Sequence, residues 1–274
     1  MDFTISTYVR LLKTLSDSGY CFKTFADSLT DPTENTVVLR HDVDRKPLNS
    51  FVFAQIQAEM GIRSTYFFRI VEESFDPGII RKIADLGHEI GYHYEDFVLA
   101  SKKVKGKSKK NGNDAEREIA SIAIESFEKN LSILRELAPV KTICMHGSPL
   151  SRWDSKLLWK YYDYHDFGLK GEPYFDVDFS KVLYLTDTGR MWDGSSVSIR
   201  DKATQRFPHS ETDIKFHSTF DIIRAAEAKQ LPGRIMFTFH PQRWNEKRIP
   251  WLKELCAQNM KNIIKHFIII FKGD

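Results

Sequence analysis

The sequence contains little cysteine and lacks the pattern of an export signal. Its three cysteines, Cys21, Cys144 and Cys256, are far apart among 274 residues and form no CxxC pair. This excludes a CxxC redox or zinc motif and fits structural thiols in a reducing compartment. The N-terminus, "MDFTISTYVRLLKTL", has an early acid and only short apolar runs. We therefore expect a cytoplasmic protein without stable membrane insertion.

An excess of one charge is also lacking. The chain carries 40 basic and 37 acidic residues, a net charge of +3, which argues against a general nucleic-acid or membrane-surface binder. Any basic preference must be local, as in "SKKVKGKSKKNGN" (101–113), which holds six lysines. We expect a solvated loop there, with a lid that attracts a phosphate-bearing sugar carrier as the alternative. Its "GKS" is not a P-loop, because the motif needs a glycine five residues before Gly106, where this chain has Ser101.

Strand and helix patterns alternate along most of the chain. Strand patterns cover residues 36–41, 64–70, 88–93, 141–146, 181–187, 196–201 and 234–240. Helical patterns cover residues 2–19, 48–61, 76–87, 113–137, 218–233 and 248–266. Short strands separated by helices predict an α/β fold with a parallel sheet, either open or closed into a barrel. No repeat or composition shift marks a boundary, so we expect one domain over residues 1–274.

Histidines stand at the ends of four predicted strands. His41, His93, His146 and His240 lie in "VVLRHDVD", "HEIGYHYED", "KTICMHGSP" and "RIMFTFHPQRW". In parallel α/β proteins the carboxyl ends of the strands share one rim, and active sites are built there. We therefore expect these segments to converge on one site.

Two acids follow the first of these strands at a spacing of two residues. On an extended chain, Asp42 and Asp44 point to the same side, whereas His41 and Val43 point the other way and are expected to pack. Two carboxylates this close repel each other unless a cation or a shared proton lies between them. With histidines from neighbouring strands, such a site suits Zn²⁺ or a similar first-row metal better than Ca²⁺ or Mg²⁺.

The ordered motifs "HDVD", "GHEIGYH" and "HP" resemble those of the polysaccharide deacetylase family, carbohydrate esterase family 4. The segments "MHGSP" and "TDTGRMWDG" add a narrower resemblance to divergent members that act in O-antigen and surface-polysaccharide biosynthesis. The resemblance covers most of the chain and implies a distorted (β/α)7 barrel. It also implies a metal-dependent hydrolase that removes an N-acetyl group from an amino sugar of a surface-polysaccharide precursor.

The resemblance assigns roles to residues of the first two motifs. In the family, the leading aspartate of the first motif is the catalytic base and the later one binds the metal. These positions correspond to Asp42 and Asp44. The second motif supplies a metal-binding histidine, which corresponds to His93.

The third metal ligand departs from the family pattern. The family places it four residues after the histidine of the second motif, where this chain has Phe97. The candidates are then His146, Glu95 and Asp96. We favour His146, because it ends the next predicted strand and is followed by Gly147, which permits a close backbone approach.

The later motifs supply the remaining catalytic candidates. In the family, the last motif gives a histidine that acts as general acid, and His240 matches it. The family also uses an arginine to hold the catalytic aspartate and an acid to hold the catalytic histidine. Loose matches for these are Arg190 and Asp193, with Asp187 as a further candidate.

Two other functions remain open at this point. The phenylalanine at the expected ligand position suggests a degenerate barrel that binds a glycan without catalysis. The lysine-rich patch suggests another metal hydrolase, such as a phosphoesterase. For the favoured reading we expect a divalent metal, with zinc preferred, and a carbohydrate substrate that can be phosphate-linked. We expect no nucleic-acid partner, and the sequence predicts no oligomeric state.

Overall fold

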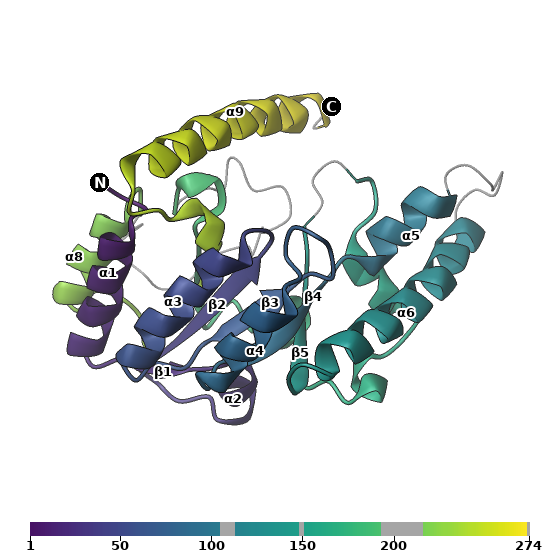
Figure 1. Cartoon of the computed structure of the whole chain (residues 1–274), viewed down its shortest axis with the longest axis horizontal. Helices are drawn as coiled ribbons and strands as arrows, with labels where there is room; N and C mark the ends of the chain where they lie inside the picture. The colour runs from purple at the N-terminus through teal and green to yellow at the C-terminus, as the bar shows by residue number, and fades with distance from the viewer. Residues whose placement is uncertain (105–112, 148–150, 193–215, 273–274) are drawn as a thin grey trace.

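A parallel sheet forms the centre of the computed structural model, which describes residues 1–104, 113–147, 151–192 and 216–272 (Figure 1). The strand order is β5 (Val140–Met145), β4 (Glu89–Tyr94), β3 (Thr65–Phe68), β2 (Thr36–Val43), β7 (Arg234–Phe239) and β6 (Leu183–Thr186). A short strand, β1 (Cys21–Lys23), pairs with the start of β2. Every pair is parallel, so all strands end at the same rim. The predicted α/β fold is confirmed.

Helices connect most of the strands and cover the outer face of the sheet (Figure 1). The α-helices are α1 (Ile5–Asp17), α2 (Phe25–Thr30), α3 (Pro47–Glu59), α4 (Pro77–Asp85), α5 (Asp96–Val104), α6 (Asn113–Arg135), α7 (Pro173–Asp176), α8 (Thr219–Glu227) and α9 (Arg248–Lys272). Short 3-10 turns are η1 (Ser155–Lys160), η2 (Tyr164–Phe167), η3 (Thr188–Arg190) and η5 (Pro241–Arg243). In the described part of the chain, no helix combines the length and apolarity needed to cross a bilayer.

One helix extends into a segment that the sequence pattern assigned to a loop. Helix α5 starts directly after β4 and takes in the first four residues of the lysine-rich patch, 101–104. Its buried positions Phe97, Ala100 and Val104 share one face, which packs on α6. The packing of this apolar face stabilises the helix even though lysines adjoin it in the sequence. Residues 105–112 of the patch and the predicted strand 196–201 lie outside the described residues.

The two faces of the sheet pack into two apolar clusters. The larger cluster lies between the strands and the outer helices. The smaller one holds a residue from each of five strands, including both edge strands, together with Phe25: Val38, Phe67, Cys144, Tyr184 and Met236. The sheet therefore curls around this inner cluster as in a barrel. Among the described residues, β5 and β6 do not pair, so the barrel is open on that side.

Close packing inside the curled sheet explains a glycine of the second motif. Gly91 on β4 lies beside Phe67 on β3, and the two are register partners. A Cβ atom at position 91 would lie 2.3 Å from a carbon of the Phe67 ring and 3.1 Å from the carbonyl oxygen of Thr142. The ring fills the space that the missing side chain leaves.

The side chains of β2 alternate between the two clusters, as expected from the extended chain. His41 points outward, where its ring stacks on Tyr66 and its Nε2 lies 3.2 Å from the Tyr8 hydroxyl and 3.0 Å from Gln57 Nε2. Burial lowers the pKa of His41 to about 3, so the imidazole is neutral. Val43 is fully buried on the same side. The prediction that these two residues pack is confirmed.

A buried carboxyl group lies near the inner cluster. Glu172 is fully buried, and its carboxyl oxygens accept hydrogen bonds from the backbone N–H groups of Met145 (2.9 Å) and Tyr174 (2.5 Å). Burial raises the pKa of Glu172 to about 7, against an ordinary value of 4.5, even though these bonds favour the ionised form.

The raised pKa of Glu172 predicts a pH-dependent stability. Between pH 4.5 and about 7 the folded chain keeps a proton on Glu172 that the unfolded chain has lost. The contribution of this group to stability therefore falls as the pH rises through that window. We expect the free energy of unfolding of Glu172→Gln, relative to that of wild type, to be higher at pH 8 than at pH 5 by roughly 2–3 kcal/mol. Urea unfolding at both pH values measures this difference. The same measurement on Glu227→Gln, an exposed acid, is the control, and an equal effect of pH on both variants would contradict the prediction.

Candidate metal centre and active site

The first motif places a buried ion pair below the rim. Arg40 and Asp42 lie two residues apart on β2, so both side chains point to the inner side of the sheet. The guanidinium makes a two-pronged contact, with Nε 2.8 Å from Oδ1 and Nη2 2.6 Å from Oδ2. Burial alone would raise the pKa of Asp42, but Arg40, together with His93 and His240, lowers it below the ordinary value. Asp42 is therefore an ionised carboxylate at neutral pH.

Three side chains from the ends of three strands meet just above this pair. The Oδ1 atom of Asp44 lies 3.6 Å from His93 Nε2 and 3.4 Å from His146 Nε2. Asp44 follows β2, His93 belongs to β4, and His146 follows β5. His93 is buried, whereas the side chains of Asp44 and His146 are 23% and 19% exposed, so the group opens toward solvent on the rim.

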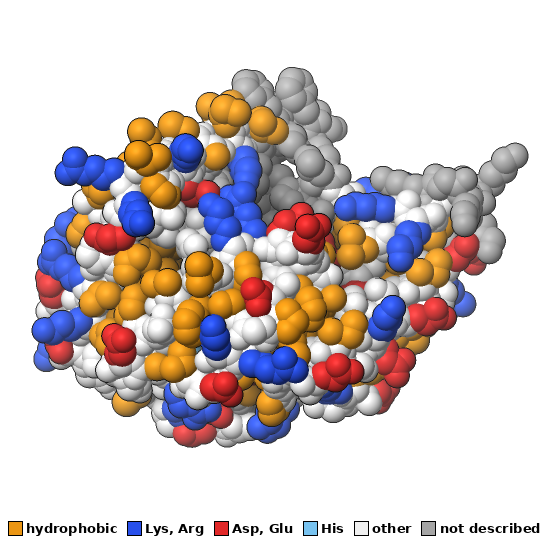
Figure 2. Space-filling model, viewed as in Figure 1, with side chains coloured by type: hydrophobic (Ala, Val, Ile, Leu, Met, Phe, Trp, Pro, Cys, Tyr) orange, Lys and Arg blue, Asp and Glu red, His pale blue; other side chains and the backbone are white. Residues whose placement is uncertain are grey.

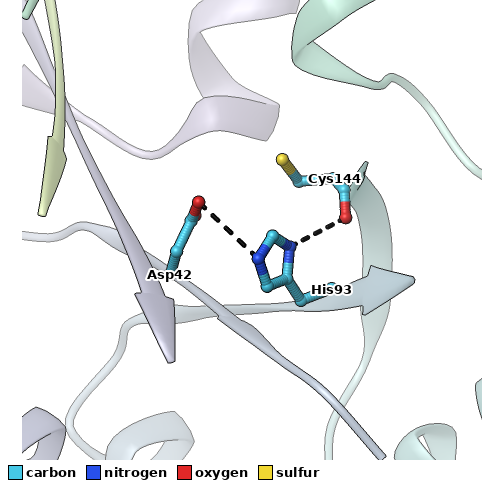
Figure 3. A group of neighbouring side chains, drawn as sticks. All are labelled: Asp42, His93 and Cys144. Atoms are coloured by element: carbon cyan, nitrogen blue, oxygen red, sulfur yellow. Dashed lines mark hydrogen bonds and ion pairs between the residues drawn. The ribbon is translucent and has the colours of Figure 1, made fainter. Parts of the chain in front are cut away.

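Polar contacts at the Nδ1 atom of each imidazole fix the orientation of the ring. The Nδ1 atom of His93 lies 2.9 Å from the carbonyl oxygen of Cys144 (Figure 3). Only a protonated Nδ1 can donate to a carbonyl, so the lone pair of the neutral ring is on Nε2, which faces Asp44. For His146, Nδ1 lies 3.4 Å from Glu95 Oε2, and Glu95 is held by Arg69 Nε at 2.7 Å.

The donor set fits a divalent metal such as zinc. Two ligands of a tetrahedral zinc ion, each about 2.0–2.1 Å from it, lie about 3.4 Å apart, close to the distances seen here. Asp44 Oδ1 is buried and has no hydrogen-bond partner among the described residues. Burial favours its neutral form, but His93, His146 and His240 lower its pKa well below the ordinary value. An ionised, unsatisfied oxygen facing two imidazole nitrogens is a cation site by its chemistry.

A second group of possible ligands shares one of these histidines. Asp42, His93 and Cys144 also bring ligand atoms within 4.8 Å of one another (Figure 3). Both oxygens of Asp42 already bind Arg40, and a cation there would face the guanidinium charge. Asp44, His93 and His146 are therefore the better candidates for metal ligands.

On the opposite side of the centre lies the histidine of the last motif. His240 Nδ1 is 2.6 Å from Asp187 Oδ1, and its Nε2 is 3.9 Å from Asp44 Oδ2. Asp187 also accepts hydrogen bonds from Arg243 Nη1 at 3.0 Å and Trp244 Nε1 at 2.7 Å. Burial alone would raise the pKa of Asp187, but His240 and Arg243 lower it. An ionised Asp187 thus holds the His240 ring with Nε2 toward the centre.

The structure places the other candidates elsewhere. Arg190 stacks on the rings of Phe3 and Trp251 and donates to the carbonyl oxygen of Trp251 at 3.2 Å, with no contact to Asp42 among the described residues. The arginine that holds Asp42 is Arg40, two residues earlier on the same strand. Asp193 lies outside the described residues, and the acid that holds His240 is Asp187, which the sequence offered only as a further candidate.

The alternative third ligands also have other partners. Asp96 accepts hydrogen bonds from Tyr92, Ser126 and Asn130 on the helix side of β4. Phe97, at the family's usual ligand position, is fully buried against Trp153 because α5 begins at Asp96. Glu95 supports His146 rather than facing Asp44.

Comparisons with known proteins give distant likenesses in structure. No family model and no curated protein sequence matches the chain. A carbohydrate esterase domain of a xylanase from the hindgut metagenome of Trinervitermes trinervoides has a TM-score of 0.37 and 11% identity, with 82% of each chain covered. A family 4 carbohydrate esterase from Streptomyces lividans, in complex with acetate, has a TM-score of 0.37 and 14% identity, covering 84% of this chain and 88% of that one.

A third solved structure is a mutant of a family 4 pseudoenzyme with restored activity, with a TM-score of 0.37 and 13% identity. The match covers 86% of this chain and 65% of that one. All three likenesses are distant, and none assigns a function to this chain.

The ligand set predicts the effect of removing one histidine. We expect wild-type protein to bind zinc stoichiometrically and His146→Ala to bind it more than about 100-fold more weakly, because even the loss of a supporting hydrogen bond costs about 10–100-fold. Glu95→Gln, which weakens the contact that supports His146, should lower the zinc affinity by about 10–100-fold. Isothermal titration with zinc, after a chelator has removed bound metal, measures both affinities. His165→Ala, at an exposed histidine, is the control, and equal zinc affinity in the two alanine variants would exclude His146 as a ligand.

Proposed function

We propose that the protein is a metal-dependent hydrolase that removes an N-acetyl group from an amino sugar. The observation that carries this proposal is that two pairs of charged side chains, each with a group able to transfer a proton, lie on either side of the three candidate metal ligands. One pair is Arg40 with Asp42, and the other is Asp187 with His240. Hydrolysis of an amide needs a base for the attacking water and an acid for the departing amine.

Asp42 is suited to accept the proton of the attacking water. Its carboxylate is kept ionised by Arg40, and its Oδ2 atom lies 3.7 Å from His93 Nε2, next to the ligand set. A water molecule bound beside the ligands would therefore be within reach of this oxygen. A divalent cation held by Asp44, His93 and His146 would lower the pKa of bound water and polarise the amide carbonyl.

His240 is suited to deliver a proton to the departing amine. Its Nδ1 is engaged by Asp187, so Nε2 is the atom that faces the centre. The Asp187 carboxylate stabilises a protonated imidazole, as in other carboxylate–histidine pairs that act in acid–base catalysis. The two proton-transfer groups thus approach the substrate from different strands, β2 and β7, which are neighbours in the sheet.

The choice of substrate rests on the sequence motifs. The order "HDVD", "GHEIGYH" and "HP" supports deacetylation, and the segments "MHGSP" and "TDTGRMWDG" support a surface-polysaccharide precursor of the O-antigen type. The departure at Phe97 does not leave the centre short of a ligand, because His146 lies at the place where a third ligand is needed.

The three cysteines form no disulfide, which supports a reducing, cytoplasmic location.

Release of acetate from N-acetylated sugar precursors tests the proposed activity. We expect zinc-loaded protein to release acetate, Asp42→Asn to be slower by at least about 100-fold, and Asp187→Asn to be slower by about 10²–10⁴-fold. His165→Ala should keep full activity. Chelated enzyme gives the metal-free background. Zinc-loaded Asp42→Asn that releases acetate at the wild-type rate would rule out the assigned base.

The arginine that holds the base can be identified from pH profiles. Without Arg40, burial raises the pKa of Asp42, so in Arg40→Gln we expect the acid limb of the rate profile to move to higher pH by about 1–3 units. Arg190→Gln should leave this limb in place. If the shift occurs in Arg190→Gln and not in Arg40→Gln, the assignment is reversed. Circular dichroism confirms that each variant is folded.

A further inference from the structure

The last helix lies over the rim and is attached to the body through polar side chains. Helix α9 crosses the top of the molecule, above the ends of the strands (Figure 1). Glu254 is buried and pairs with Arg45 at 3.0 Å, and Asn262 Nδ2 donates to the carbonyl oxygen of Gly189 at 2.9 Å. With Gln258, which is also buried, these residues follow a spacing of four and form one face of the helix.

The solvent-facing side of α9 carries several large apolar side chains. Among its described side chains, the largest exposed hydrophobics are Ile249 (70%), Leu252 (54%), Met260 (66%), Ile263 (57%) and Ile264 (56%). Hydrophobic and basic side chains are seen together at the top of Figure 2, where this helix lies. A surface helix of a globular protein normally shows the reverse, with its apolar face toward the core. Large exposed apolar side chains gathered on one helix in this way mark a binding face.

The charges that accompany this apolar face are of one sign. Arg248, Lys253 and Lys261 are exposed, and the acid of this stretch, Glu254, is buried in its pair with Arg45. The sequence of the helix continues as "KHFIIIFK" (265–272), again without an acidic residue. An apolar face bordered by lysine and arginine is complementary to anionic lipid headgroups above acyl chains.

We propose that α9 binds the surface of an anionic membrane through its exposed apolar face. The helix would lie in the interface rather than cross the bilayer, which agrees with the lack of a helix, in the described part of the chain, that could span one. A second copy of the chain is a poorer partner, because two such helices would bring their basic residues together. Arg45, which anchors the buried face of the helix, follows Asp44 of the candidate metal centre directly in the sequence.

Sedimentation of the full chain with lipid vesicles tests this proposal independently of catalysis. We expect binding to equimolar phosphatidylglycerol and phosphatidylcholine vesicles, at least about tenfold weaker binding to phosphatidylcholine alone, and weakening by salt. The double substitution Ile263→Asp and Ile264→Asp should reduce binding to the anionic vesicles at least about tenfold. Zinc content and circular dichroism of each variant show whether the rest of the fold is intact.

A matched control separates loss of apolar surface from added charge. Ala257→Asp with Asn259→Asp adds the same two charges at exposed positions of α9 and removes no large apolar side chain. It should bind more tightly than the isoleucine variant. Met260→Asp provides a single-site version of the same test. An equal loss in the isoleucine variant and the control would overturn the role of the apolar face.

Two further results would also overturn the proposal. One is the absence of binding to anionic vesicles by the wild-type chain. The other is a lipid-free dimer, seen by light scattering, that Ile263→Asp with Ile264→Asp converts to monomer while vesicles capture neither form. That result would assign the face to a second copy. Because none of these measurements uses a sugar substrate, their failure is distinguishable from failure of the proposed hydrolase.

Discussion

The ion pair between Arg40 and Asp42 is the interaction on which the arrangement of the site depends. It lies on the inner side of a curled sheet whose other contents are mainly apolar, where an unpaired charge would be very costly. The pair keeps Asp42 ionised and occupies both of its oxygens. Asp44, two residues further along, is then the carboxylate left to face the histidines. A spacing of two residues thus separates the proposed base from the proposed metal ligand.

The histidines depend on a second set of contacts that fix which ring nitrogen faces the centre. The carbonyl of Cys144 engages His93, Glu95 lies against His146, and Asp187 holds His240. In each case the partner is at Nδ1, so Nε2 faces the centre. These partners orient each imidazole ring before a metal or substrate binds. The acidic partners are buried or nearly so, which keeps solvent from competing for them.

Much of the fold was predictable from sequence because its signals are local. Runs such as "TVVLR" and "RIMFTF" alternate with helical patterns, and the parallel sheet follows from that alternation. The convergence of His93, His146 and His240 followed from the shared rim. Strand β1 and helix α2 were missed because three and six residues carry too little periodicity. Helix α5 was missed because lysines masked its apolar face.

By itself the sequence determined the strand ends, the same-side placement of Asp42 and Asp44, and the helix at residues 248–266. Only the tertiary structure decided which arginine and which acid support the site, because Arg190 packs against Trp251 instead of Asp42 and the pairing of β6 with β7 brings Asp187 to His240. The tertiary structure likewise decided which face of α9 is buried. Periodicity predicts a helix with two faces, but polar partners such as Arg45 turn its polar face inward and leave its apolar face in solvent.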